Sequence, residues 1–87
     1  MRIDKYLKVA RVLKRRAVGK ELADNQRLFI NGRPAKAAAE VKVNDEIAIA
    51  FGHRTIKIRV LEIREQASKQ DALAMYEVLA EERVSDE

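Results

Sequence analysis

The spacing of the apolar residues changes along this chain of 87 residues, and that change sets the fold class. Up to about residue 25 they recur every three or four positions, which is typical of amphipathic helices. From residue 28 onward they come in short runs and alternations bounded by Asn, Asp and Gly, which is typical of strands and turns. Two helices followed by such strands predict an α+β domain, with the helices packed on a small, mainly antiparallel sheet.

The two N-terminal helices are predicted from local signals. Asp4 is a candidate N-cap of the first helix. After the basic turn at residues 14–16, a second helix is predicted from residue 17 to about residue 25. Gly19 lies inside it, where Gly costs about 1 kcal/mol relative to Ala, so it marks either a close helix–helix contact or a tolerated Gly.

Three strands are predicted at residues 28–30, 47–51 and 55–63. The turn signal at residues 31–32 ends the first of them, and Pro34 confines the returning segment to a sheet edge. The alternation breaks near the end of the third strand, which indicates a bulge or a strand end.

The last apolar stripe predicts a C-terminal helix. Ala72, Met75, Tyr76 and Leu79 follow the spacing i, i+3, i+4, i+7 of one helix face. Residues 1–87 are then a single domain, in which a core of about 1–51 is followed by an extension, a strand and a helix, at about 54–84.

The composition excludes several kinds of site. The chain has no Cys, which excludes disulfides and thiolate metal sites, and its one His, His53, cannot build a zinc site alone. We therefore expect no metal, no cofactor and no catalytic residue. No apolar run approaches the roughly 20 residues of a membrane span. The basic N-terminal segment taken alone also fits a membrane-surface helix, but the rest of the chain favours a folded, cytoplasmic monomer.

The charge is concentrated in the N-terminal part. Residues 1–36 carry eleven Lys and Arg against three acids, a net charge of +8, while residues 37–87 carry seven against eleven, a net charge of −4. A compact basic half on so small a chain predicts a polyanionic partner, and nucleic acid is the commonest one.

Three segments resemble the S-four RNA-binding domain, a family named for ribosomal small-subunit protein four. Residues 2–7 (RIDKYL) look like its R-L-D-x-x-L start, and Arg16 with residues 27–32 (RLFING) looks like its second motif. Residues 41–47 (VKVNDEI) look like its closing V-K-x-G-D-x-I. The resemblance implies an RNA-binding surface made by the two helices and the turn that follows them.

By match to these motifs, Arg2 and Arg16 are the first candidates for phosphate contacts. Asp4 is expected to be a cap or a carboxylate that orients an arginine, and Tyr6 either stacks on a base or lies half-buried. The predicted RNA-binding residues are Arg2, Lys5, Arg11, Lys14, Arg15, Arg16, Lys20, Arg33 and Lys36.

Three residues depart from the family pattern. Gly19 stands where the family usually has Ala, while Gln26 and Asn44 stand where it usually has Gly. Gly is favoured at such turns because it tolerates a positive φ, and Asn is the usual second choice, so either Asn25 or Gln26 is predicted to make the turn after the second helix with some strain.

The closer resemblance is to short, stand-alone S-four proteins of ribosome-associated quality control, with a small heat-shock S-four protein beside them. Residues 7–16, 51–65 and 72–82 carry it across nearly the whole chain. The likeness implies binding to large-subunit ribosomal RNA and to tRNA when the subunit is obstructed by a peptidyl-tRNA. There the protein would support a partner protein that adds C-terminal alanines to the stalled chain.

Other functions stay open. A general heat-shock-type rescue factor for large subunits would use the same basic face. A DNA-binding helix-turn-helix protein fits two short helices loosely, although the second helix exposes Lys20, Glu21 and Asp24 rather than base-reading Asn or Gln. An RNA-modifying enzyme would need an attached catalytic domain or a Gly-rich phosphate loop, which the sequence does not show.

Overall fold

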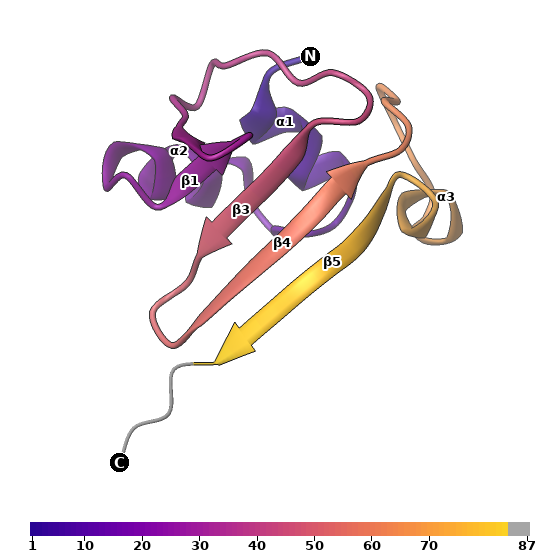
Figure 1. The fold of residues 1–87 in the computed structure, drawn as a ribbon. Coiled ribbons are helices and arrows are strands. Elements are labelled where there is room, and N and C mark those ends of the chain that lie inside the picture. The colour runs from indigo at the N-terminus through magenta and orange to yellow at the C-terminus, as the bar shows by residue number, and fades with distance from the viewer. Residues whose placement is uncertain (84–87) are drawn as a thin grey trace.

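A computed structural model describes residues 1–83. Its elements are α1 (Ile3–Val9), α2 (Arg16–Asp24), β1 (Leu28–Ile30), β2 (Arg33–Pro34), β3 (Glu46–Ala50), β4 (Arg54–Val60), α3 (Lys69–Leu73) and β5 (Tyr76–Arg83). The five strands form one antiparallel sheet in the order β2-β1-β3-β4-β5 (Figure 1). The predicted α+β class is confirmed.

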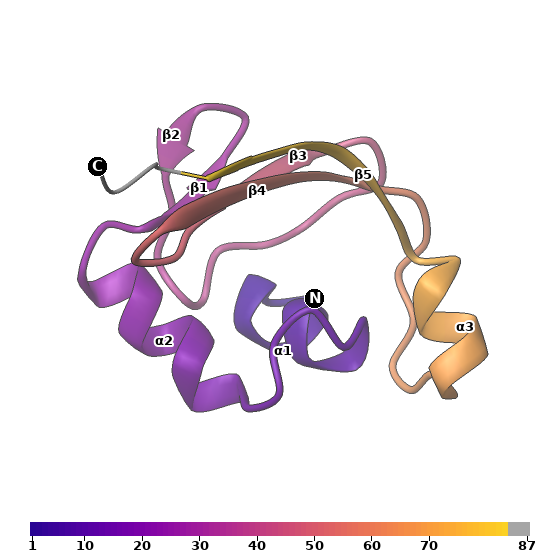
Figure 2. The same cartoon turned by 90° about the horizontal axis from the view of Figure 1, so that it is seen from below.

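The two N-terminal helices cover one face of the sheet, and within residues 1–83 no helix covers the other (Figure 2). Alternation in the strands places Ile47 and Ile49 of β3 and Ile58 of β4 on the covered face, where they are fully buried. Ile3 and Leu7 of α1 meet them from the helical layer. Burying each such side chain contributes about 1.5–3 kcal/mol, so this layer contact is the main stabilising feature.

The predicted C-terminal helix is confirmed only as the short helix α3. Ser68 is the N-cap of α3, and its Oγ accepts a hydrogen bond from the Asp71 N–H at 3.1 Å. The predicted continuation through Tyr76 and Leu79 is wrong, because residues 76–83 form β5 and pair with β4. Pairing with a neighbouring strand overrides the helix propensity of a segment rich in Ala, Leu and Glu.

The irregularity predicted near the end of β4 has two separate outcomes. The strand ends at Val60, so the prediction of a strand end is confirmed. A shift in register also occurs, but it lies between Lys57 and Ile58 in the pairing with β5. The predicted extension to about residue 84 passes one residue beyond the described part of the chain.

Both N-terminal helices end in Schellman motifs without glycine. After α1, the N–H of Val12 bonds to the Leu7 carbonyl and the N–H of Arg11 to the Lys8 carbonyl, each at 3.0 Å, with Arg11 at φ 61°. After α2 the same two bonds form around Gln26 at φ 57°. Of the two candidates for the turn after α2, Gln26 takes the positive φ and Asn25 does not (φ −96°), and Asn44 also has a positive φ (78°).

One backbone carbonyl joins the two ends of the fold. The Met75 carbonyl accepts the Tyr6 hydroxyl at 2.7 Å and the N–H groups of Leu61 and Glu62 at 2.8 and 3.1 Å. Tyr6 is fully buried, which excludes the alternative that it stacks on a base. Within residues 1–83, no helix is long and apolar enough to cross a bilayer.

Candidate nucleic-acid interface

A buried carboxylate holds the two leading candidates together. Asp4 is only 3% exposed, and its Oδ2 accepts Arg2 Nη2 at 3.1 Å and Arg16 Nε at 3.2 Å. Its Oδ1 accepts the backbone N–H of Lys5 at 2.7 Å. Arg2 and Arg16 remain about half exposed, so their other N–H groups face solvent. Arg2 and Arg16, which Asp4 holds together, are called the arginine pair below.

Asp4 is therefore charged in the folded protein. Burial raises the pKa of its carboxyl, but the hydrogen bonds from Arg16 and from the Lys5 N–H, with the charges of both arginines, outweigh burial and hold the pKa below its usual value. The prediction that Asp4 orients an arginine agrees with this geometry. Its prediction as an N-cap is wrong, because Arg2 occupies that position without a side-chain cap.

Backbone groups of a distant loop take the place of that cap. The N–H of Ile3 bonds to the Ala39 carbonyl at 2.8 Å, and the N–H of Asp4 to the Ala37 carbonyl at 3.3 Å. These bonds satisfy donors at the first turn of α1 that have no partner within the helix. Lys36 directly precedes Ala37, whose carbonyl bonds to the N–H of Asp4, so the segment after β2 lies close to the arginine pair.

Gly19 sets the distance between α1 and α2. A Cβ at this position would lie 3.3 Å from both the Cα and the Cβ of Asp4. The close contact predicted as one of two alternatives for Gly19 is confirmed. It brings the first turn of α2, where Arg16 lies, against the carboxylate of Asp4.

The remaining predicted residues are distributed over several places. Arg15 directly precedes α2 and Lys20 lies on its exposed side. Lys5 is bound by the carboxylate of Glu65, a partner 60 residues away that no local sequence pattern predicts. Arg11 and Lys14 line a pocket beside α1.

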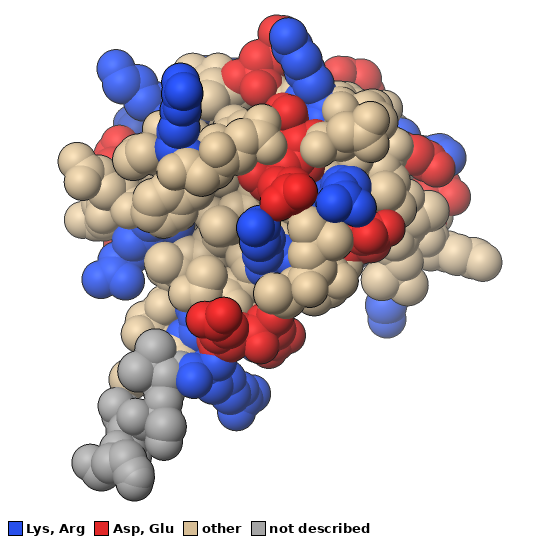
Figure 3. Space-filling model, viewed as in Figure 1, with Lys and Arg blue, Asp and Glu red and all other residues tan. Residues whose placement is uncertain are grey.

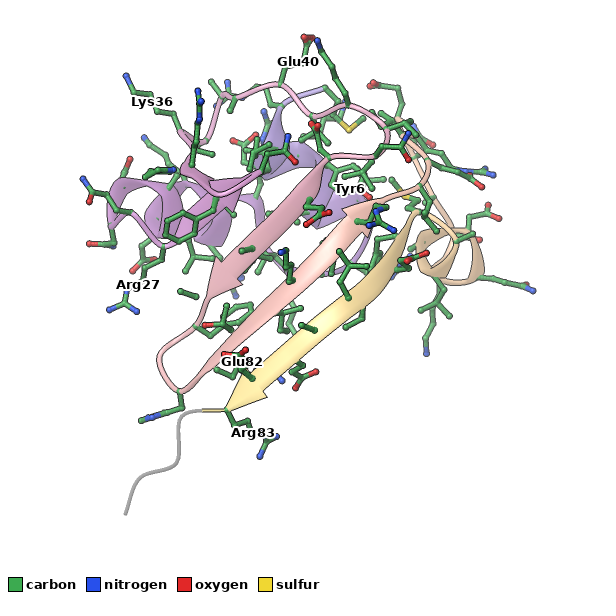
Figure 4. All side chains as sticks on the ribbon, viewed as in Figure 1. Tyr6, Arg27, Lys36, Glu40, Glu82 and Arg83 are labelled. Carbon is green, nitrogen blue, oxygen red and sulfur yellow. The ribbon has the colours of Figure 1, made fainter. Side chains whose placement is uncertain are left out.

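Arg33 and Lys36 belong to another part of the surface. They line a hollow of about 440 Å³ whose other walls are apolar. Lys36 projects into solvent beside β2, as Arg27 does at the end of α2, while Glu82 and Arg83 lie at the far end of β5 (Figure 4). The nine predicted residues are therefore distributed over α1, the turn before α2, α2 and the segment around β2 rather than gathered in one cluster.

The uncovered face of the sheet is not basic. Glu46 binds Lys57 at 3.1 Å and Arg59 at 3.4 Å, and Arg59 also binds Glu77 at 3.4 Å. Blue and red side chains are accordingly mixed on this face (Figure 3). On this face the two cations meet two carboxylates, whereas Arg2 and Arg16 share the single carboxylate of Asp4 and keep a net positive charge, so the helical side is the better candidate surface.

Comparison with known proteins identifies the family of the chain. The sequence profile of the S4 domain matches residues 1–47, which contain α1, α2 and the first strands. The chain belongs to the S4 domain family. The predicted resemblance to S-four proteins is thereby confirmed, and the arginine pair lies inside the matched S4 segment.

The similarity to individual proteins extends beyond the S4 segment. A Streptococcus pneumoniae protein named RQC P-site tRNA stabilizing factor is 48% identical, covering 99% of this chain and 98% of its own length. A Bacillus subtilis protein of the same name is 43% identical, covering 99% of this chain and all of its own. Among solved structures, the trimeric heat shock protein 15 of Vibrio cholerae has a TM-score of 0.83 at 27% identity, covering 92% of this chain and 82% of that one.

Proposed function

We propose that this S4 protein is an RNA-binding factor of ribosome-associated quality control. It binds obstructed large ribosomal subunits that carry peptidyl-tRNA, contacts ribosomal RNA and tRNA, and supports alanine tailing of the stalled chain by a partner protein. The observation that carries the proposal is identity of 41–48% over nearly the whole chain to proteins named RQC P-site tRNA stabilizing factor. The site of action would be the cytoplasm.

The arginine pair supplies a physical reason for RNA binding. Arg16 uses its Nε for Asp4, which leaves its terminal nitrogens available for a phosphate, and Arg2 uses a single Nη2. A guanidinium already fixed by a buried carboxylate loses little freedom when it binds a phosphate fork-to-fork. Counterion release then supplies most of the free energy of binding.

The proposed role is binding rather than catalysis. The pair consists of two cations held by one neutralised carboxylate, which positions charge but offers no group poised for proton transfer or nucleophilic attack. The factor would act by holding RNA in place while its partner performs the chemistry.

Sedimentation through a sucrose gradient tests the proposal. We expect the tagged wild-type protein to migrate with large subunits that contain peptidyl-tRNA, and the Arg2→Ala/Arg16→Ala variant to remain at the top. The matched control is Lys57→Ala/Arg59→Ala, which removes the same charge from the uncovered sheet face and should still comigrate. If the wild type also remains at the top, the ribosomal function is wrong.

The likeness to heat shock protein 15 favours a second candidate, a rescue factor that binds large subunits without alanine tailing. Both functions use the same arginine pair, so the gradient does not separate them. Mass spectrometry of a stalled reporter chain does. Alanine tails that shorten when this protein is deleted support the first function, and tails of unchanged length support the second.

A further inference from the structure

An open pocket of about 400 Å³ lies beside the C-terminal end of α1. Its floor is apolar and formed by Val9, Leu13 and Ala67, with the side chains of Lys8, Arg11, Lys14, Glu65 and Gln66 around it. Residues 65–67 lie outside the segment matched to the S4 domain, so the C-terminal part of the chain builds one wall.

Three cations at this pocket lack an ion-pair partner within residues 1–83. The described ion pairs engage Arg2, Lys5, Arg16, Arg54, Lys57, Arg59 and Arg64, but not Lys8, Arg11 or Lys14. Glu65, the one acid among the lining residues, is bound to Lys5 and already neutralised. The pocket therefore carries a net positive charge that no described carboxylate offsets.

Arg11 occupies a position where glycine is the favoured residue. It is the C′ residue of the Schellman motif that ends α1, with φ 61°. A side chain in this left-handed region carries a conformational cost that Gly avoids. Gln26 adopts the same conformation, and what distinguishes Arg11 is that its side chain is a cation that lines the pocket.

We propose that this pocket is a second phosphate-binding subsite, which takes an RNA backbone phosphate between Arg11 and its neighbours Lys8 and Lys14. Gln66 also lines the pocket, and its amide can donate a hydrogen bond to a phosphate oxygen or bond a ribose 2′-hydroxyl. The inference rests on the proposed function, because it takes RNA as the partner.

The subsite and the arginine pair lie at opposite ends of α1. The helix has seven residues and is about 10 Å long, so we expect Arg2 before its start and Arg11 after its end to engage different phosphates. Two fixed subsites at such a separation select the shape of a folded RNA rather than its sequence.

Two matched glycine variants test the subsite. Arg11→Gly and Gln26→Gly both place Gly at the C′ residue of a Schellman motif, but only the first removes a cation from the pocket. We expect neither to lower the thermal midpoint. Fluorescence anisotropy with a labelled RNA hairpin, measured over a range of KCl concentrations, should show roughly fivefold weaker binding and a salt slope smaller by about one unit for Arg11→Gly alone.

The remaining outcomes separate this inference from the proposed function. If the hairpin binds wild type and loses affinity with Arg2→Ala/Arg16→Ala but not with Arg11→Gly, the subsite is wrong and the proposed function stands. If wild type does not bind RNA in a salt-dependent way, the proposed function fails, and the subsite with it.

NMR adds a readout at single residues. On addition of inorganic phosphate we expect amide shifts at residues 8–14 and 65–67, and RNA should abolish the response by occupying the pocket. A phosphate response that persists at saturating RNA shows a site for small anions and overturns the proposal.

Discussion

At the scale of single residues, the arginine pair depends on one carboxylate. Arg2 and Arg16 were predicted from the sequence because each belongs to a local motif. The contact of both side chains with Asp4 Oδ2 was not predicted, because it depends on how α1 packs against α2. Arg11 was predicted as an RNA contact, whereas its positive φ could not be, because that requires knowing where α1 ends.

Acidification should weaken the fold through Asp4. Its pKa is lower in the folded chain than the value near 3.9 of an unfolded one, so its contribution is complete above about pH 5 and is lost as the pH falls through the folded-state pKa. Asp4→Asn loses the charge-assisted bonds and should cost about 2 kcal/mol at pH 7. Urea unfolding between pH 7 and pH 2 should show this gap shrinking, and a constant gap would contradict the assignment.

At the scale of the elements, local pattern predicted α1, α2 and most of the strands, because spacing and turn residues mark them. The local pattern failed for β5. The spacing of Ala72, Met75 and Tyr76 fits one continuous helix, but it fits equally well a helix that ends and is followed by a strand. What decides between the two is pairing with β4, a contact between segments far apart in sequence. Such non-local contacts leave no signal in a short window.

The packing of α1 on α2 should fail when Gly19 is enlarged. The Asp4 backbone lies 3.3 Å from a Cβ at this position, so Gly19→Leu forces the helices apart and should cost about 3 kcal/mol. Glu21→Leu, on the exposed side of the same helix, should change stability by less than about 0.5 kcal/mol. Chemical unfolding followed by circular dichroism measures both, and equal costs would refute the contact as the cause.

At the scale of the whole molecule, the charges are divided between the two sides of the sheet. Cations on the helical side, at the pocket beside α1, have no described acidic partner, while those on the uncovered side are paired with Glu46 and Glu77. The sequence predicted the uneven charge along the chain. It did not predict that the neutral side would be a sheet face, because this depends on β5 taking the edge position.

Removing the Tyr6 hydroxyl should loosen the link between the ends of the fold. Tyr6→Phe deletes one of three hydrogen bonds to the Met75 carbonyl and keeps the ring packing, so we expect a loss of about 1 kcal/mol. Tyr76→Phe is the control, since none of the described hydrogen bonds uses its hydroxyl. Urea denaturation compares the two, and an equal loss in both would exclude the hydroxyl bond as the cause.

The Met75 carbonyl also restricts when this protein can fold. Tyr6 is near the N-terminus, but the carbonyl that accepts its hydroxyl lies 69 residues later in the chain. The N–H groups of Leu61 and Glu62 donate to the same oxygen. A growing chain therefore cannot complete the layer beneath α1 until residue 75 has left the exit tunnel. The contact between α1 and Met75 is therefore a late, non-local step of folding, which closes only after most of the chain has been synthesised.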